Sequence, residues 1–187
     1  MFMVNCWVIK PKRDLDGRKE YENNWKNFID EKENRGNKVI AIGWSLGTAD
    51  SSNNLNQLRQ YMNSLYTKPM EANIAANTIW KFIMEMKKGD EVICDGYTFQ
   101  QKSDVLVYGI ARITGEYWED KDCPWFQRKR NIELLNKIEK RVPKELLADS
   151  LGLKTLLKTI HEIKNTNFNN TKKRIIEYAL DFTLRSL

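Results

Sequence analysis

Three of the six tryptophans lie where an apolar run gives way to a polar loop. Trp44 follows the apolar run in IAIGWSLGTAD, Trp118 closes the run in ITGEYWED, and Trp125 lies in CPWFQRKR, three residues before the first of three positive charges. Binding residues concentrate on loops that a rigid scaffold holds. A ring beside Arg and Lys suits a nucleic acid, because the ring can stack on a base while the cations hold phosphates. The pattern indicates a nucleic-acid site; the alternative for each ring taken singly is partial packing beneath a loop.

The other three tryptophans have the spacing of core residues. Trp7 lies in an alternating, strand-like run, whereas Trp25 and Trp80 lie on the apolar faces of segments with helical periodicity. We expect all three rings to pack in the interior of the protein.

The elements that must position these residues alternate between strands and helices. Period-two or continuous apolar runs predict strands, and apolar residues at intervals of three and four predict helices. The predicted strands are residues 3–9, 38–43, 91–95, 104–118 and 128–135. The predicted helices are residues 20–31, 54–65, 71–86, 153–163 and 171–185, with a further helical segment beginning at Pro143. This order predicts a mixed α/β (α+β) core, a small curved sheet with helices, followed by a helical tail.

Composition and charge restrict the class of protein. The 187 residues suffice for one globular domain, and 41% hydrophobic with 30% charged residues is typical of a soluble chain. No apolar stretch approaches the roughly 20 residues that span a bilayer. The N-terminus has no charged segment of the kind that begins a signal peptide, so we expect a cytoplasmic protein. The formal net charge of +6 indicates an anionic partner, since counterion release drives association with nucleic acid.

Motifs for binding nucleotide phosphates are absent from the sequence. It contains neither a GxxxxGKS/T nor a GxGxxG phosphate-binding loop. His161 is the single histidine and we interpret it as structural, while three scattered cysteines predict reduced thiols and no zinc site. Asp30, Glu31 and Lys32 fit a metal-nuclease element, but they lie in a charged helix end where a solvated face is the simpler interpretation. We therefore expect a binding protein without catalysis, cofactor or metal.

Several motifs, taken in sequence order, resemble one family. They are CWVIKPKRD, IAIGW, NTIWKFIMEMKKGDEVI, VLVYGIARITGEY and NIELL. The chain resembles the EVE branch of the PUA-like superfamily, to which the YTH readers of N6-methyladenine are related. More narrowly, it resembles the N-terminal DNA-reading domains of McrBC-type modification-dependent restriction systems. The resemblance covers about residues 4–135 and implies a curved, barrel-like mixed sheet flanked by helices. We expect residues 1–150 to form the base-binding domain and residues 151–187 to form a C-terminal helical extension or linker.

The resemblance also implies a site, in which one modified base is turned out of the stack and held between aromatic rings. The residues that it assigns to the base are Trp44, Ser45, Tyr117, Trp118, Trp125 and Asp95. Asp16 is a second candidate, besides Asp95, for reading the edge of the base. The cations expected to hold phosphates are Lys10, Lys12, Arg13, Lys102, Arg112, Arg128, Lys129 and Arg130.

The function that follows is recognition without catalysis. We expect a domain that reads a methylated base in DNA and targets a restriction system whose GTPase motor and nuclease lie elsewhere. The residues do not select among N6-methyladenine, 5-methylcytosine and 5-hydroxymethylcytosine. Three alternatives stay open: a module that reads modified or structured RNA, a protein-interaction domain whose C-terminal helices form an oligomerisation face, and an unrecognised enzyme.

Overall fold

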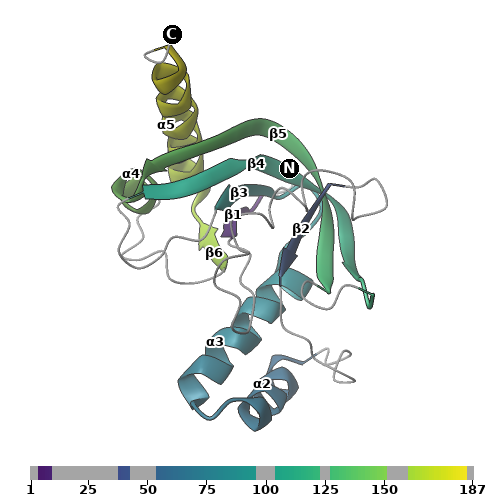
Figure 1. The fold of residues 1–187 in the computed structure, drawn as a ribbon. Coiled ribbons are helices and arrows are strands. Elements are labelled where there is room, and N and C mark those ends of the chain that lie inside the picture. The colour runs from purple at the N-terminus through teal and green to yellow at the C-terminus, as the bar shows by residue number, and fades with distance from the viewer. Residues whose placement is uncertain are drawn as a thin grey trace.

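A six-stranded mixed sheet forms the centre of the protein (Figure 1). The computed structural model describes residues 4–9, 38–42, 54–95, 104–122, 127–150 and 160–184. The strands are β1 (Cys6–Ile9), β2 (Val39–Ile42), β3 (Glu91–Asp95), β4 (Asp104–Glu119), β5 (Arg128–Pro143) and β6 (Ile160–Ile163), in the sheet order β2-β5-β4-β3-β1-β6. Only β1 and β3 pair in parallel among these neighbours. The long strands β4 and β5 arch over the others (Figure 1), and the predicted α+β class with a curved mixed sheet is confirmed.

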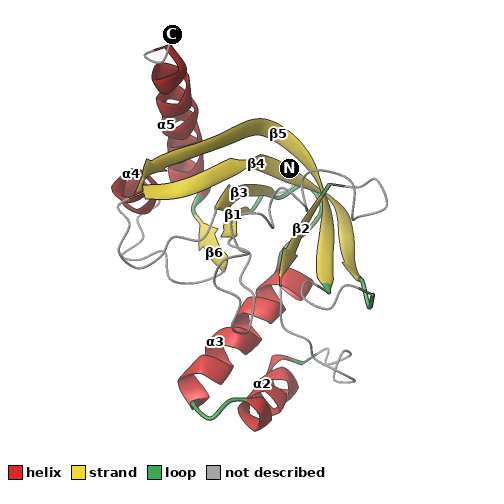
Figure 2. Ribbon diagram, in the orientation of Figure 1, coloured by secondary structure: helices red, strands yellow, loops and turns green. Residues whose placement is uncertain are grey.

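Helices accompany the sheet on both sides (Figure 2). They are α2 (Leu55–Leu65), α3 (Pro69–Trp80), the π-helical turn η1 (Lys81–Glu85), α4 (Lys144–Ser150) and α5 (Asn165–Leu184). The Asn54 side chain caps α2 by accepting the N–H of Asn56 at 2.8 Å. Pro69 occupies the start of α3, where its missing N–H is not needed. None of the helices that the structure describes is long and apolar enough to cross a membrane.

The sheet separates two hydrophobic clusters, and β1 shows how. Its side chains alternate, so that Trp7 and Ile9 join the cluster covered by α2 and α3, whereas Cys6 and Val8 join the cluster covered by α4 and α5. All four are buried. A strand that is covered on both faces must be apolar throughout, which explains the unbroken CWVI run and confirms the predicted interior position of Trp7.

One predicted helix is wrong at its C-terminal end. Residues 160–163, expected to finish a helix over 153–163, form strand β6 instead. β6 runs antiparallel to β1, with His161 opposite Val8. A position beside the edge of β1 gives this short segment its ladder of hydrogen bonds, and that partner lies far away in the sequence. His161 therefore lies in a strand and not on a helix.

Two further elements differ from prediction in extent. The predicted helix over 71–86 is α3 followed directly by η1, a wider π-helical turn with i→i+5 hydrogen bonds that ends at Glu85. β5 continues to Pro143, well past residue 135, because it pairs along most of its length with the equally long β4. The helix expected to begin at Pro143 begins one residue later, as α4.

Candidate functional site

A cavity of about 410 Å³ lies between the α3–η1 segment and the edge strand β6. Its lining residues are Leu55, Ile74, Asn77, Thr78, Trp80, Lys81, Glu85, Ile160, His161 and Glu162. The volume falls within the range of small-molecule pockets, about 300–1,000 Å³. Apolar walls with a few convergent polar groups are the usual composition of such a pocket. We name this feature the α3–β6 cavity.

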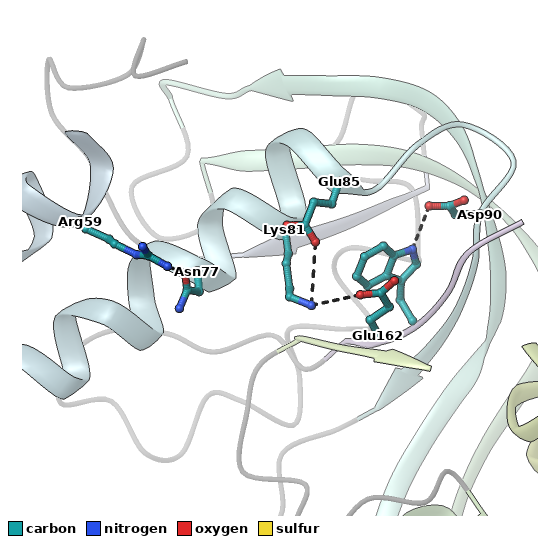
Figure 3. Close-up of polar contacts among 7 residues, drawn as sticks. Arg59, Asn77, Lys81, Glu85, Asp90 and Glu162 are labelled. Atoms are coloured by element: carbon teal, nitrogen blue, oxygen red, sulfur yellow. Dashed lines mark hydrogen bonds and ion pairs between the residues drawn. The ribbon is translucent and has the colours of Figure 1, made fainter. Parts of the chain in front are cut away.

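One stripe of the α3–η1 segment supplies most of the wall. Ile74, Asn77, Lys81 and Glu85 follow one another at intervals of three and four, which places them on one helical face. Arg59 on α2 fixes the Asn77 amide, because its Nη2 donates to Asn77 Oδ1 at 3.0 Å (Figure 3). With Oδ1 taken by the guanidinium, the amide nitrogen is left to donate to a ligand.

Lys81 is the cation of the α3–β6 cavity. Its Nζ lies 3.4 Å from Glu162 Oε2 and 3.9 Å from Glu85 Oε2, so the ammonium stands between two carboxylates (Figure 3). The same Nζ lies 5.5 Å from the centre of the buried Trp7 indole ring. Two ion pairs and a cation–π contact orient the side chain before any ligand arrives. Among the lining residues that the structure describes, carboxylates outnumber ammonium groups, so this part of the wall suits a ligand that donates hydrogen bonds.

Asp90 fixes the Trp7 indole ring, with which Lys81 makes its cation–π contact. Its Oδ2 accepts hydrogen bonds from Trp7 Nε1 at 2.8 Å and from the Lys87 N–H at 3.0 Å, and its Oδ1 accepts from the Asn5 N–H at 3.1 Å. The Asp90 side chain is buried. One carboxylate thus ties the start of β1, the indole and the turn after η1 together, and it fixes the orientation of the indole behind Lys81.

Tyr117 and Trp118, predicted to contact the base, do not line the α3–β6 cavity. They lie near the end of β4 and pack against the α2–α3 cluster. The Tyr117 hydroxyl donates to Glu119 Oε1 at 2.6 Å, and Trp118 Nε1 donates to Asn131 Oδ1 at 3.0 Å. Lys129 Nζ lies 5.4 Å from the centre of the Trp118 ring. Both rings therefore have structural contacts of their own.

The strands next to the predicted aromatic residues end side by side. β2 ends at Ile42 opposite Arg128, the first residue of β5, and Arg128 pairs on its other side with Glu119, the last residue of β4. Trp44 comes two residues after β2 in the sequence and Trp125 three before β5; both lie outside the described residues. Ser45, Asp16, Lys10, Lys12, Arg13 and Lys102 also lie outside them, and Asp95 is described only as the end of β3.

Arg128, Lys129 and Arg130 are buried, which corrects the expectation that they face solvent and hold phosphates. Each is 1% exposed. Arg128 forms an ion pair with Glu119 at 3.2 Å, and Lys129 forms one with Asp120 at 2.6 Å. The reason is topological: the first residues of β5 pair with β2 on one side and with β4 on the other, so neighbouring strands flank them.

Arg130, a residue of β5, has a structural role because its side chain binds carbonyl groups of η1. Its Nε donates to the Phe82 carbonyl and its Nη2 donates to the Ile83 carbonyl, both at 2.8 Å. These carbonyls belong to the last helical turn, which has no helical partners for them. Burial lowers the pKa of Arg130 below its ordinary value, although the charge of Glu116 opposes this effect.

Arg112 is a predicted phosphate contact whose side chain the structure exposes, at 45%. Its Nη2 lies 3.1 Å from Glu91 Oε1, which also receives Lys172 on its other oxygen at 2.9 Å. Burial alone would raise the pKa of Glu91, but hydrogen bonds from Lys172 and Arg112 outweigh it, and the pKa lies below the ordinary value. Arg112 thus keeps access to solvent while paired, as a phosphate contact on a surface requires.

The described thiols lie in the interior of the protein. Cys6 and Cys94 are buried, and neither forms a disulfide. Burial raises the pKa of Cys6 to about 11, so the protonated thiol predominates at neutral pH. Among the described residues, no group of three or more His, Cys, Asp or Glu side chains is arranged to hold a metal ion.

Comparisons with known proteins give one family and several distant structures. A family model described as Domain of unknown function (DUF8426) matches residues 17–164. A search of curated proteins found no match. The solved structure of Atu2648 from Agrobacterium tumefaciens is 13% identical with a TM-score of 0.43, over 92% of this chain and 93% of that one. A hypothetical protein from Leishmania major is 11% identical with a TM-score of 0.46, over 94% and 97%. Human THYN1, solved in complex with DNA containing 5-methylcytosine, is 14% identical with a TM-score of 0.43, over 91% and 97%.

Proposed function

The chain belongs to the family described as Domain of unknown function (DUF8426), and we propose that it binds DNA and takes one modified base into the α3–β6 cavity. The observation that carries the proposal is the convergence of an amide, a hydroxyl, an ammonium and two carboxylates on a cavity of about 410 Å³. Enzymes and readers that act on a single base take it out of the stack and read its hydrogen-bonding edge with such groups.

The charges of the lining favour a base with an exocyclic amino group. Within the described part of the lining, Glu85 and Glu162 outnumber Lys81, so these residues make a poor phosphate site although the whole chain carries a net charge of +6. Carboxylates accept hydrogen bonds from the amino group of cytosine. Lys81 and Asn77 can donate to the ring nitrogen and carbonyl beside it. Modified cytosine presents all three groups and modified adenine presents the amino group and the ring nitrogen, whereas thymine lacks the amino group.

Stacking on aromatic side chains offsets the free-energy cost of extruding the base from the duplex. Extruding a base costs a few kcal/mol, and stacking on an aromatic side chain returns about 1–3 kcal/mol. Trp80 lines the α3–β6 cavity, and we assign the opposing ring of an aromatic cage to Trp44. A buried methyl group adds only about 0.8 kcal/mol. The polar groups of the cavity must therefore provide most of the discrimination between bases.

The wider role that we propose is target recognition in a modification-dependent restriction system. The domain reads the modified site without catalysing a reaction, and a GTPase motor and a nuclease outside this domain act on the DNA. The sequence motifs that resemble McrBC-type reading domains support this role. Arg112, together with Lys10, Lys12, Arg13 and Lys102, is assigned to the phosphates, where contacts position the protein and carry no sequence information.

A fluorescence-polarisation panel tests the proposed function. One DNA duplex carries in turn no modification, N6-methyladenine, 5-methylcytosine and 5-hydroxymethylcytosine, and it is titrated with wild type and with Trp44→Ala. We expect one modified duplex to bind about tenfold tighter than the unmodified one, and Trp44→Ala to remove most of that preference, because a stacking ring is lost. Equal, weak binding of all four duplexes would contradict the proposal that the protein recognises a modified base. Tighter binding of an RNA with the same base would reassign the ligand to RNA.

A further inference from the structure

The first turn of α3 presents an exposed apolar side chain, Met70, one helical turn before Ile74, which lines the α3–β6 cavity. We propose that Met70 enters the DNA base stack and fills the space left by the flipped base; this inference rests on the proposed function. Ile74, one turn further along α3, and Leu65, the last residue of α2, are the nearest exposed apolar residues in the sequence, and we name the three the wedge surface. The partner is the stack of a DNA duplex around the modified nucleotide.

The helical stripe that lines the cavity leads directly to Met70. Ile74 lines the cavity, and Met70 precedes it by four residues, so the two lie on the same helical face. Met70 lies seven residues before Asn77, about 10 Å along the helix axis at 1.5 Å per residue. The polar groups that hold the base and the side chain that replaces it thus belong to one rigid helix. Figure 1 shows that this helix leads away from the sheet, with its first turn at the far end.

The three side chains of the wedge surface are exposed to solvent. Met70 is 73% exposed, Leu65 55% and Ile74 42%. Among the described residues, six large apolar side chains are exposed, and these three lie between the end of α2 and the second turn of α3, whereas the others are dispersed along the chain. A cluster of exposed apolar side chains next to a ligand cavity marks an interaction surface.

The chemistry of the wedge surface fits DNA. Proteins that kink or open a duplex insert Met, Leu or Ile between base steps, where the side chain replaces lost stacking contacts. Methionine is unbranched and adapts to an irregular gap. Lys68, two residues before Met70, forms an exposed ion pair with Glu71 at 3.1 Å, and its ammonium can exchange this partner for a phosphate beside the opened step. An apolar side chain and an exposed ammonium therefore stand together in the first turn of α3, one turn before the cavity-lining Ile74.

A comparison of duplex and single-stranded DNA tests the wedge. Met70→Gln keeps the length of the side chain and removes its apolar character; Met84→Gln, at a methionine of η1 that is also exposed but does not line the cavity, is the matched control. Both are titrated with the preferred modified oligonucleotide as a duplex and as a single strand. A single strand has no stacked pair to open, so we expect Met70→Gln to weaken duplex binding about tenfold and to leave single-strand affinity within about twofold. Met84→Gln should change neither affinity by more than about twofold.

The outcomes separate the wedge from the proposed function. Equal loss of affinity for duplex and single strand, or no loss for either, overturns the wedge while the preference for the modified base persists. Absence of that preference in the wild type, in both forms of DNA, overturns the proposed function itself. A Met70-dependent self-association in sedimentation, without a change in duplex binding, assigns the surface to a second copy of the chain and also overturns the wedge.

Discussion

Asp90→Ala is expected to lower the free energy of unfolding by about 3–4 kcal/mol, a large fraction of the roughly 5–15 kcal/mol that stabilises a typical domain. The substitution removes the acceptor of three hydrogen bonds, from the indole of Trp7 and the backbone N–H groups of Asn5 and Lys87. A buried donor that loses its partner costs about 1–3 kcal/mol. Urea denaturation followed by circular dichroism measures the change.

Asp122→Ala is the control for this experiment. Asp122 is exposed in the turn after β4, so its removal should shift the unfolding free energy by less than about 0.5 kcal/mol. A loss below about 1 kcal/mol in Asp90→Ala would show that Asp90 does not tie β1 to the turn after η1. The orientation of the indole behind Lys81 would then need another cause.

A second large effect is expected from the amino group of the base. Single-stranded oligonucleotides that carry 5-methylcytosine or thymine at one position share the 5-methyl group and differ at the amino or carbonyl substituent and its ring nitrogen. We expect the 5-methylcytosine oligonucleotide to bind about 10- to 100-fold tighter, because a well-formed base contact discriminates by about 1–3 kcal/mol. Fluorescence polarisation with wild type and Glu162→Gln measures the ratio. Glutamine both accepts and donates, so the ratio should fall markedly in the variant.

Glu177→Gln provides the matched control, since Glu177 lies exposed on α5 and pairs only along that helix with Lys173 at 3.8 Å among the contacts described. Its ratio should equal that of the wild type. An unchanged ratio in Glu162→Gln would remove Glu162 from the recognition of the base. If the wild type binds the thymine oligonucleotide more tightly, the carboxylates of the cavity do not select a base with an amino group.

Elements with a strong local pattern could be predicted from the sequence. The unbroken CWVI run predicts β1, and the long alternating run around Gly109 predicts β4, because burial on one or both faces dictates the pattern directly. α3 also follows from its apolar periodicity, although the change to η1 at Lys81 leaves no clear sequence signal.

Features that depend on distant partners could not be predicted. β6 is four residues long and exists through pairing with β1, more than 150 residues earlier in the chain. The side chains of Arg128–Arg130 suggested a surface, but the pairing of β5 with β2 and β4 buries them. The α3–β6 cavity joins Lys81 to Glu162 across 81 residues, and neither residue type stands out in a chain with 30% charged residues.

The measurement that tests the central claim most directly is the modified-base preference after the α3–β6 cavity is filled. Ile74→Trp places a large ring at the cavity wall, and Met84→Trp places the same ring on η1 at a residue that does not line it; both positions are 42% exposed in the wild type. The preference is the ratio of affinities for the modified and unmodified single strand, so effects on duplex opening do not enter. We expect a ratio near one for Ile74→Trp and the wild-type ratio for Met84→Trp. A wild-type ratio in both variants would show that the modified base does not enter this cavity.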